Sequence, residues 1–103
     1  MVIVDRNRLQ SCGYDEEVLN YGDIGAKFEA FGFNSITIDG HDHGAINAAF
    51  EKALAPSGKP TAIIANTVKG KGVSFMEGKN AWHGAPIGKE HFDEAIRELG
   101  GTV

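Results

Sequence analysis

The chain has 103 residues, 42% of them hydrophobic, and a formal net charge of −4, which suits one small globular domain and argues against a basic nucleic-acid-binding surface. No apolar run approaches the roughly 18 residues that a membrane span requires, so no membrane partner is expected. The single cysteine, Cys12, excludes an internal disulfide and fits a reducing, cytoplasmic location.

The first half of the chain predicts two strands and one helix. Val2–Val4 is β-branched and apolar on both faces, which favours a buried parallel strand over a signal peptide. Asp23 is a candidate N-cap for a short helix over about Ile24–Phe31, which Gly32 would end. The alternating, β-rich segment Asn34–Asp39 predicts the second strand.

The second half continues the same alternation of strands and helices. Asp42 is a candidate N-cap for a helix over about His43–Leu54, and the apolar segment Thr61–Asn66 predicts a third strand. A long loop then leads to a last helix that begins near Gly88 and carries an apolar stripe of Phe92, Ala95, Ile96 and Leu99. This order predicts an α/β fold in which helices cover both faces of a parallel sheet, a three-layer α/β/α arrangement.

Three polar or glycine-rich segments follow the predicted strands. They are residues 5–9, 39–42 and 66–74. In an open α/β sheet, ligands bind beyond the carboxyl ends of the strands. The sequence therefore predicts that the chain carries at least part of a binding site at this edge.

Asn7 and Leu9 are the first candidates for metal ligands. The side-chain oxygen of Asn7 and the backbone carbonyl of Leu9 can point at one hard cation such as Mg²⁺. The alternative is a strand-to-loop turn in which Asn7 bonds the local backbone.

Basic and imidazole side chains supply the other candidates. The segment Lys69–Gly72 has the composition of a phosphate loop but lacks the P-loop spacing, so a solvated loop is the alternative. His83 could bind an anion or transfer a proton near neutral pH, or it could be a packing histidine. His41 and His43 have the spacing of a metal pair but no further Cys or His nearby, and Cys12 is interpreted as structural.

Six stretches taken together resemble the thiamine-diphosphate-binding domain of transketolases. The resemblance is greatest to the separate N-terminal subunits of split bacterial or archaeal transketolases. Each stretch is weak alone, but all occur in the family's order: DRNRLQ at 5–10, FGF at 31–33, IDGHD at 38–42, KPT at 59–61, TVKGKGVSFME at 67–77 and WHGAP at 82–86.

The resemblance implies an activity and roles for three residues. Transketolases use thiamine diphosphate to transfer a two-carbon ketol unit between sugar phosphates, as in the pentose phosphate pathway. Asn7 matches the family asparagine that ligates Mg²⁺ or Ca²⁺, and Leu9 matches the residue whose carbonyl is a further ligand. His83 matches the catalytic histidine that reaches the cofactor diphosphate and the substrate.

The chain departs from the family pattern because it has no Gly-Asp-Gly, the start of the family's metal-diphosphate motif. We therefore expect residues 1–103 to form a single partial domain, the C-terminal part of the cofactor-binding fold, and to be inactive alone. The resemblance implies that the partner is a pyrimidine-binding domain or subunit, in a homodimer or heterotetramer. The alternatives are a segment of a 1-deoxyxylulose-5-phosphate synthase or dihydroxyacetone synthase, and a non-catalytic interaction module that retains the fold.

Overall fold

The computed structural model describes residues 1–102 of the chain. They fall into two compact units. Unit 1 comprises Met1–Asn7 and Tyr21–Thr67, and unit 2 comprises Arg8–Asn20 and the chain from Val68 onward.

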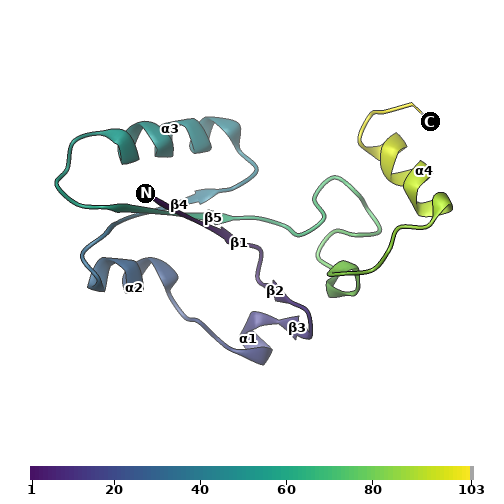
Figure 1. Ribbon diagram of the computed structural model, residues 1–103, viewed down its shortest axis with the longest axis horizontal. Coiled ribbons are helices and arrows are strands. Elements are labelled where there is room, and N and C mark those ends of the chain that lie inside the picture. The colour runs from purple at the N-terminus through teal and green to yellow at the C-terminus, as the bar shows by residue number, and fades with distance from the viewer. Residues whose placement is uncertain (103) are drawn as a thin grey trace. The chain divides into compact units, whose positions relative to one another are not determined.

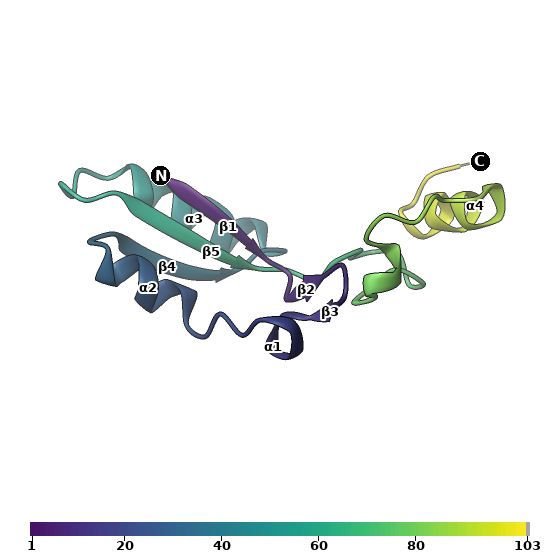
Figure 2. The ribbon, with the colours of Figure 1, turned by 60° about the horizontal axis from the view of Figure 1, so that its bottom comes forward.

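Unit 1 is built on a three-stranded parallel sheet. Strands β1 (Val2–Arg6), β4 (Asn34–Asp39) and β5 (Thr61–Asn66) lie in the order β1-β5-β4, with β5 in the middle (Figure 2). The central strand is the most apolar of the three, and Ile63 within it is only 1% exposed. The hydrophobic core of unit 1 therefore lies around β5.

Two helices cover opposite faces of this sheet, which confirms the predicted three-layer α/β/α arrangement (Figure 1). They are α2 (Ile24–Ala30) and α3 (His43–Leu54). Both predicted N-caps are confirmed: the Asp23 carboxylate accepts from the Ala26 N–H at 3.0 Å, and the Asp42 carboxylate accepts from the Gly44 N–H at 2.7 Å. Each carboxylate thereby satisfies an N–H that has no partner within its helix.

The prediction that the first strand is buried on both faces is wrong. Val2 is 37% exposed and Ile3 is 57% exposed, although β1 is parallel to β5 as expected. The reason is position, because α2 and α3 pack over β4 and β5, while β1 lies at the edge of the sheet. An apolar sequence identifies a strand, but its burial depends on the elements that surround it.

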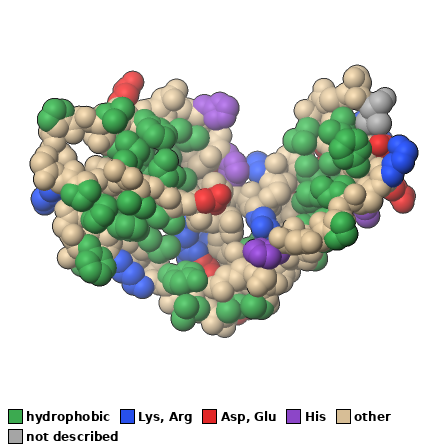
Figure 3. All heavy atoms as spheres, viewed as in Figure 1, with side chains coloured by type: hydrophobic (Ala, Val, Ile, Leu, Met, Phe, Trp, Pro, Cys, Tyr) green, Lys and Arg blue, Asp and Glu red, His purple; other side chains and the backbone are tan. Residues whose placement is uncertain are grey.

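Unit 2 contains short elements joined by loops. A two-stranded antiparallel ribbon, β2 (Leu9–Gln10) and β3 (Gly13–Tyr14), leads into the one-turn helix α1 (Asp15–Val18). The 3-10 turn η1 (Asn80–Trp82) and helix α4 (Lys89–Glu98) follow the long loop. The apolar stripe of α4 is only partly covered, because Ala95 is buried whereas Phe92 and Leu99 are exposed. Figure 3 shows hydrophobic side chains at the surface of both units.

Within residues 1–102, no helix has both the length and the apolar composition needed to cross a membrane.

Candidate functional site

The carboxyl ends of the three parallel strands are tied together in unit 1. The Thr67 N–H donates to the Arg6 carbonyl at 3.2 Å, and the Thr67 hydroxyl donates to the Asp5 carboxylate. The Gly40 N–H donates to the Asn66 carbonyl at 2.7 Å, so the ends of β4 and β5 are joined as well. The polar segments that follow these strands therefore start from one edge of the sheet, where ligands bind in open α/β folds.

Gly40 permits this close approach at the ends of β4 and β5. A Cβ at this position would lie 2.5 Å from the Thr67 Cγ2 and 3.1 Å from the Asn66 carbonyl oxygen. Only glycine lets the two strand ends lie this close without displacing Thr67.

Asn7 and Leu9, the candidate metal ligands, lie on either side of the division between the two units. Asn7 directly follows β1 and belongs to unit 1, whereas Leu9 is the first residue of β2 and pairs with Tyr14 in unit 2. Both are partly buried. An amide oxygen and a peptide oxygen are suitable donors for Mg²⁺ or Ca²⁺, but octahedral magnesium needs more oxygen ligands than these two.

Arg8, between the two candidate ligands, has a backbone conformation that the sequence did not reveal. Its φ is +60°, and it is the one residue other than glycine with a positive φ among residues 1–102. Arginine rarely adopts this left-handed conformation, which is strained and concentrates at functional sites. The strained turn therefore coincides with the segment that the sequence selected for metal binding.

A buried carboxyl group that sequence reasoning missed lies next to this turn in unit 2. Asp15 begins α1 and is only 2% exposed. Its N–H donates to the Arg8 carbonyl at 3.0 Å, so α1 helps to hold the strained turn. Nothing in the local pattern distinguishes Asp15 from the exposed acidic residues Glu16 and Glu17 that follow it.

His83, the candidate catalytic residue, follows η1 in unit 2 and is exposed. Its backbone has helical angles, φ −63° and ψ −29°, and its N–H donates to the Asn80 carbonyl at 2.9 Å. The imidazole is therefore carried on a hydrogen-bonded turn and is accessible for anion binding or proton transfer.

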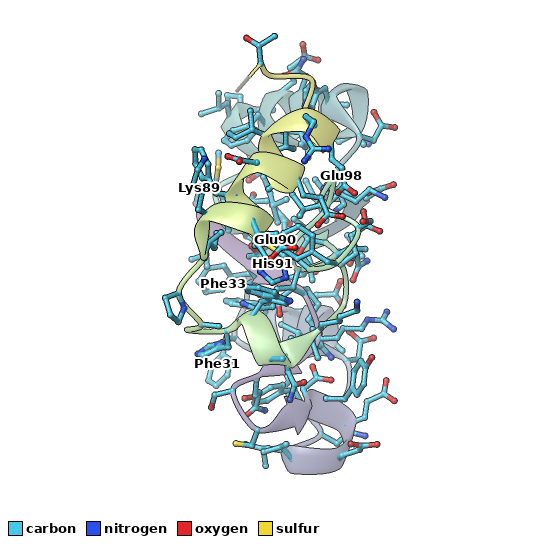
Figure 4. The ribbon with its side chains drawn as sticks, turned by 90° about the vertical axis from the view of Figure 1, so that its right-hand side faces the viewer. Phe31, Phe33, Lys89, Glu90, His91 and Glu98 are labelled. Atoms are coloured by element: carbon cyan, nitrogen blue, oxygen red, sulfur yellow. The ribbon has the colours of Figure 1, made fainter. Side chains whose placement is uncertain are left out.

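The residue before His83 is held by an aromatic cluster that we call the Trp82 cluster, made of Phe75, Trp82 and His91. The ring centroid of Trp82 lies 5.2 Å from that of Phe75 and 5.3 Å from that of His91. The Trp82 indole N–H also donates to the Phe75 carbonyl at 2.9 Å. His91 lies on α4 (Figure 4), and sequence reasoning missed it because it falls outside the apolar stripe of that helix.

The glycine- and lysine-rich loop folds on itself through its own carboxylate. The Glu77 carboxylate accepts from the Gly72 N–H at 2.9 Å and pairs with the Lys71 ammonium at 3.5 Å. Gly70 has φ +73°, and a Cβ there would lie 2.7 Å from the Met76 Cβ. In this conformation Glu77 already occupies donors that a phosphate-cradling loop would offer to its ligand.

A second carboxylate joins the loop to α4. Glu98 accepts from both the Ser74 N–H and the Ser74 hydroxyl, each at 2.5 Å. These hydrogen bonds, the hydroxyl one first, lower the pKa of the Glu98 carboxyl below its usual value. The like charge of Glu77 acts in the other direction but is outweighed. Glu98 is a surface residue, yet it fixes the backbone directly before Phe75.

The remaining candidates gain no support as metal ligands. Within residues 1–102, no group of three or more His, Cys, Asp and Glu side chains is arranged to hold a metal ion. The His41 N–H donates to the Asp39 carboxylate at 2.9 Å, and His43 begins α3. Cys12, expected to have a structural role, is instead exposed in the turn between β2 and β3.

Residues 1–102 match the family described as "Transketolase, thiamine diphosphate binding domain". The chain is 39% identical over 99 residues to the 6-deoxy-6-sulfo-D-fructose transketolase subunit SqwG of a Clostridium species, covering 96% of this chain and 36% of that protein. It is 37% identical over 99 residues to one subunit of the apulose-4-phosphate transketolase of Phocaeicola vulgatus, covering 96% of this chain and 35% of the relative. The chain thus spans about a third of the length of these two relatives.

The structure is similar to a solved transketolase as well. The crystal structure of transketolase from Campylobacter jejuni matches with a TM-score of 0.88 and 38% sequence identity. The match covers 97% of this chain and 16% of that one.

Proposed function

Because the chain belongs to the transketolase family, through its thiamine-diphosphate-binding domain, we propose that it forms part of the cofactor site of a ketol-transferring enzyme. The enzyme would move a two-carbon ketol unit from a ketose phosphate to an aldose phosphate. The observation that carries this proposal is the family match over residues 1–102. The convergence of the three strand ends in unit 1 gives the proposal a physical basis, since ligands bind at that edge.

Asn7 and Leu9 would hold the divalent cation, Mg²⁺ or Ca²⁺, that ties the cofactor diphosphate to the protein. The Asn7 amide oxygen and the Leu9 carbonyl have the donor chemistry that these cations prefer. The strained turn at Arg8 supports this role, because it separates the two donors by a single residue of unusual conformation. Further ligands would come from parts of the enzyme outside these 103 residues.

His83 would act on the diphosphate and on the substrate. Thiamine diphosphate supplies the electron sink for the carbanion of the transferred ketol unit. The exposed His83 imidazole would donate a hydrogen bond to the diphosphate and exchange protons with substrate hydroxyl groups. Histidine suits this task because it is the side chain that most often serves as a general acid or base.

A complete enzyme would need a partner for this chain. Each of the two relatives named above is one subunit of a transketolase, which supports an assembly of separate chains. The proposed partner is a pyrimidine-binding domain or subunit, in a homodimer or heterotetramer that works in the cytoplasm. Sugar phosphates are the proposed substrates, and the named relatives favour a transketolase over the related synthases.

Two ligands alone hold a divalent cation only weakly, so the metal site is tested by a manganese titration that detects weak binding to the 103-residue chain. Mn²⁺ accepts the same oxygen ligands as Mg²⁺ and is paramagnetic, so it broadens nuclear magnetic resonance signals of nearby atoms. With thiamine diphosphate at millimolar concentration, we expect the signals of Asn7 and Leu9 to broaden first. An Asn7→Ala variant should lose this selective broadening, whereas Asn47→Ala, which removes an exposed amide from α3, should keep it.

Broadening centred on other residues, or unchanged by Asn7→Ala, would contradict the proposed metal ligands. The same titration followed at the His83 imidazole, with Mg²⁺ in place of Mn²⁺, tests the diphosphate contact. A shift of that imidazole signal that requires thiamine diphosphate supports the role of His83, and an unchanged signal argues against it.

A further inference from the structure

The position of His83 depends on Trp82, the residue before it. The hydrogen bond of its own backbone is local, from the His83 N–H to the Asn80 carbonyl within the same turn. Trp82, in contrast, reaches residues far along the chain, through its indole N–H to Phe75 and through ring contacts to Phe75 and His91. The location of the turn in unit 2 thus depends on what holds the Trp82 cluster.

Helix α4 contacts this cluster and the neighbouring loop from one face. His91 and Glu98 are seven residues apart, about two helical turns, so their side chains project from the same side of α4 (Figure 4). His91 lies 4.9 Å from Phe75 between ring centroids, and Glu98 binds Ser74. The helix therefore contacts two consecutive residues of the loop, Ser74 and Phe75.

Of the two contacts that α4 makes with the loop, the hydrogen bonds between Glu98 and Ser74 are a stronger type of interaction than the ring contact between His91 and Phe75. A carboxylate that accepts two hydrogen bonds makes charge-assisted interactions, which are shorter and stronger than neutral ones. Both distances, 2.5 Å, are in the short range. Ring contacts such as those of His91 are less directional and add mainly surface burial.

We propose that Glu98 is a positioning residue: it holds Ser74, and hence Phe75 and Trp82, against α4, and so determines the position of His83. The importance of this position for catalysis rests on the proposed function of His83. The positioning itself is a property of unit 2 alone and needs neither cofactor nor partner.

The single tryptophan of the chain makes the proposal measurable. Because Trp82 is the only tryptophan in the sequence, its indole N–H gives one resonance and its fluorescence one emission band. In Glu98→Ala we expect the indole N–H to exchange with solvent about tenfold faster, because a charge-assisted hydrogen bond no longer opposes opening of the loop. The His83 imidazole signal should shift at the same time.

Matched controls separate positioning from a general loss of stability. Glu90→Ala removes a carboxylate from the same helix, next to His91, and should leave the Trp82 exchange rate unchanged. The exchange of the Ile63 amide, in the core of unit 1, should be the same in both variants. Far-ultraviolet circular dichroism confirms that each variant is folded.

Variants of Ser74 test the contact from its other side. Ser74→Ala should accelerate the Trp82 exchange as well, and Ser74→Thr, which keeps a hydroxyl, should restore much of the protection. In the double variant Ser74→Ala/Glu98→Ala the Trp82 indole N–H should exchange no faster than in Glu98→Ala, because the two changes remove the same interaction. If Glu98→Ala does not fold, the Ser74 variants decide the question.

Unchanged Trp82 exchange in folded Glu98→Ala or Ser74→Ala would overturn the proposal. So would faster Trp82 exchange without any change at His83, because Glu98 would then hold the cluster and not the histidine. These measurements contain no metal or cofactor. A failure of the manganese titration would therefore count against the proposed function and leave the role of Glu98 standing.

Discussion

The hydroxyl of Thr67 donates a hydrogen bond to the carboxylate of Asp5, which joins the end of β5 to the end of β1. Thr67 also binds the Arg6 carbonyl through its N–H. One residue therefore fixes the place from which the chain continues toward Asn7. This side-chain hydrogen bond joins β1 and β5, the same two strands that pair through their backbones in the sheet.

Replacing this hydroxyl should weaken unit 1. Thr67→Val keeps the shape of the side chain but leaves the Asp5 carboxylate without its donor, so we expect a loss of about 1 kcal/mol in the free energy of unfolding. Thr67→Ser should recover most of it. Urea denaturation measures both values, with Thr37→Val, an exposed threonine on β4, as the control. Equal stability of Thr67→Val and the unmodified chain would show that the hydrogen bond contributes nothing.

The positive φ of Arg8 predicts an unusual order of stability at that position. In helices and strands, a protein with glycine at a given site is usually less stable than one with alanine there, by about 0.5–1 kcal/mol. At Arg8 we expect the reverse, with Arg8→Gly more stable than Arg8→Ala by about 1 kcal/mol, because the left-handed conformation penalises a Cβ. Thermal or urea unfolding of the two variants checks the sign. Greater stability of the alanine variant would mean that the turn is not strained.

The cost of replacing Gly25 should depend on its neighbour Ser35. A Cβ at Gly25 would lie 2.8 Å from the Ser35 Oγ, where α2 packs on β4. Gly25→Ala should therefore destabilise unit 1 by about 1 kcal/mol, since overpacking outweighs the better helix propensity of alanine. In a Ser35→Ala background only the Asp23 Oδ1 remains in tight contact, at 3.2 Å, so the same substitution should cost clearly less. A double-mutant cycle by chemical denaturation measures this coupling.

The contact between Glu98 and Ser74 should depend on pH. The hydrogen bonds from Ser74 lower the pKa of Glu98, so its contribution to stability is fully present above the pKa of an unfolded glutamate. That contribution decreases as the pH falls through the lowered pKa, where the carboxyl gains a proton. Acidification should therefore raise the exposure of Trp82, measured by its fluorescence, and Glu77 is the nearby carboxyl that opposes the shift.

A Glu98→Gln variant separates this titration from others in the chain. The amide can still bridge Ser74 weakly but cannot gain a proton, so the acid-induced change in Trp82 fluorescence should disappear. Glu90→Gln should leave it in place. If the change persists in Glu98→Gln, another group is responsible.

The secondary structure of unit 1 was predictable because it depends on local chemistry. Asp23 and Asp42 each precede an apolar repeat, and each accepts the backbone hydrogen bonds that the sequence suggested. The strand Thr61–Asn66 was identified with its observed bounds. The exposure of Val2 and Ile3 was missed because it depends on what lies beyond the edge of the sheet.

Much of unit 2 could not be predicted in this way. The left-handed turn at Arg8 and the burial of Asp15 have no local signal, since arginine and aspartate occur in many exposed turns. His91 and Glu98 act on a loop more than a dozen residues earlier, and such contacts exist only after the loop has folded. The sequence resemblance singled out Asn7, Leu9 and His83 but contained no information about the residues that support them.

The central position of β5 has a consequence for how the sheet assembles. Val2 pairs with Ala62, so β1 can pair with β5 only after the whole segment between them has been synthesised. Among the described residues, β5 is the strand that pairs with β1, and pairing of distant segments is slow because the connecting chain must first close. The strand order β1-β5-β4 can therefore be completed only after Thr61–Asn66 has been synthesised.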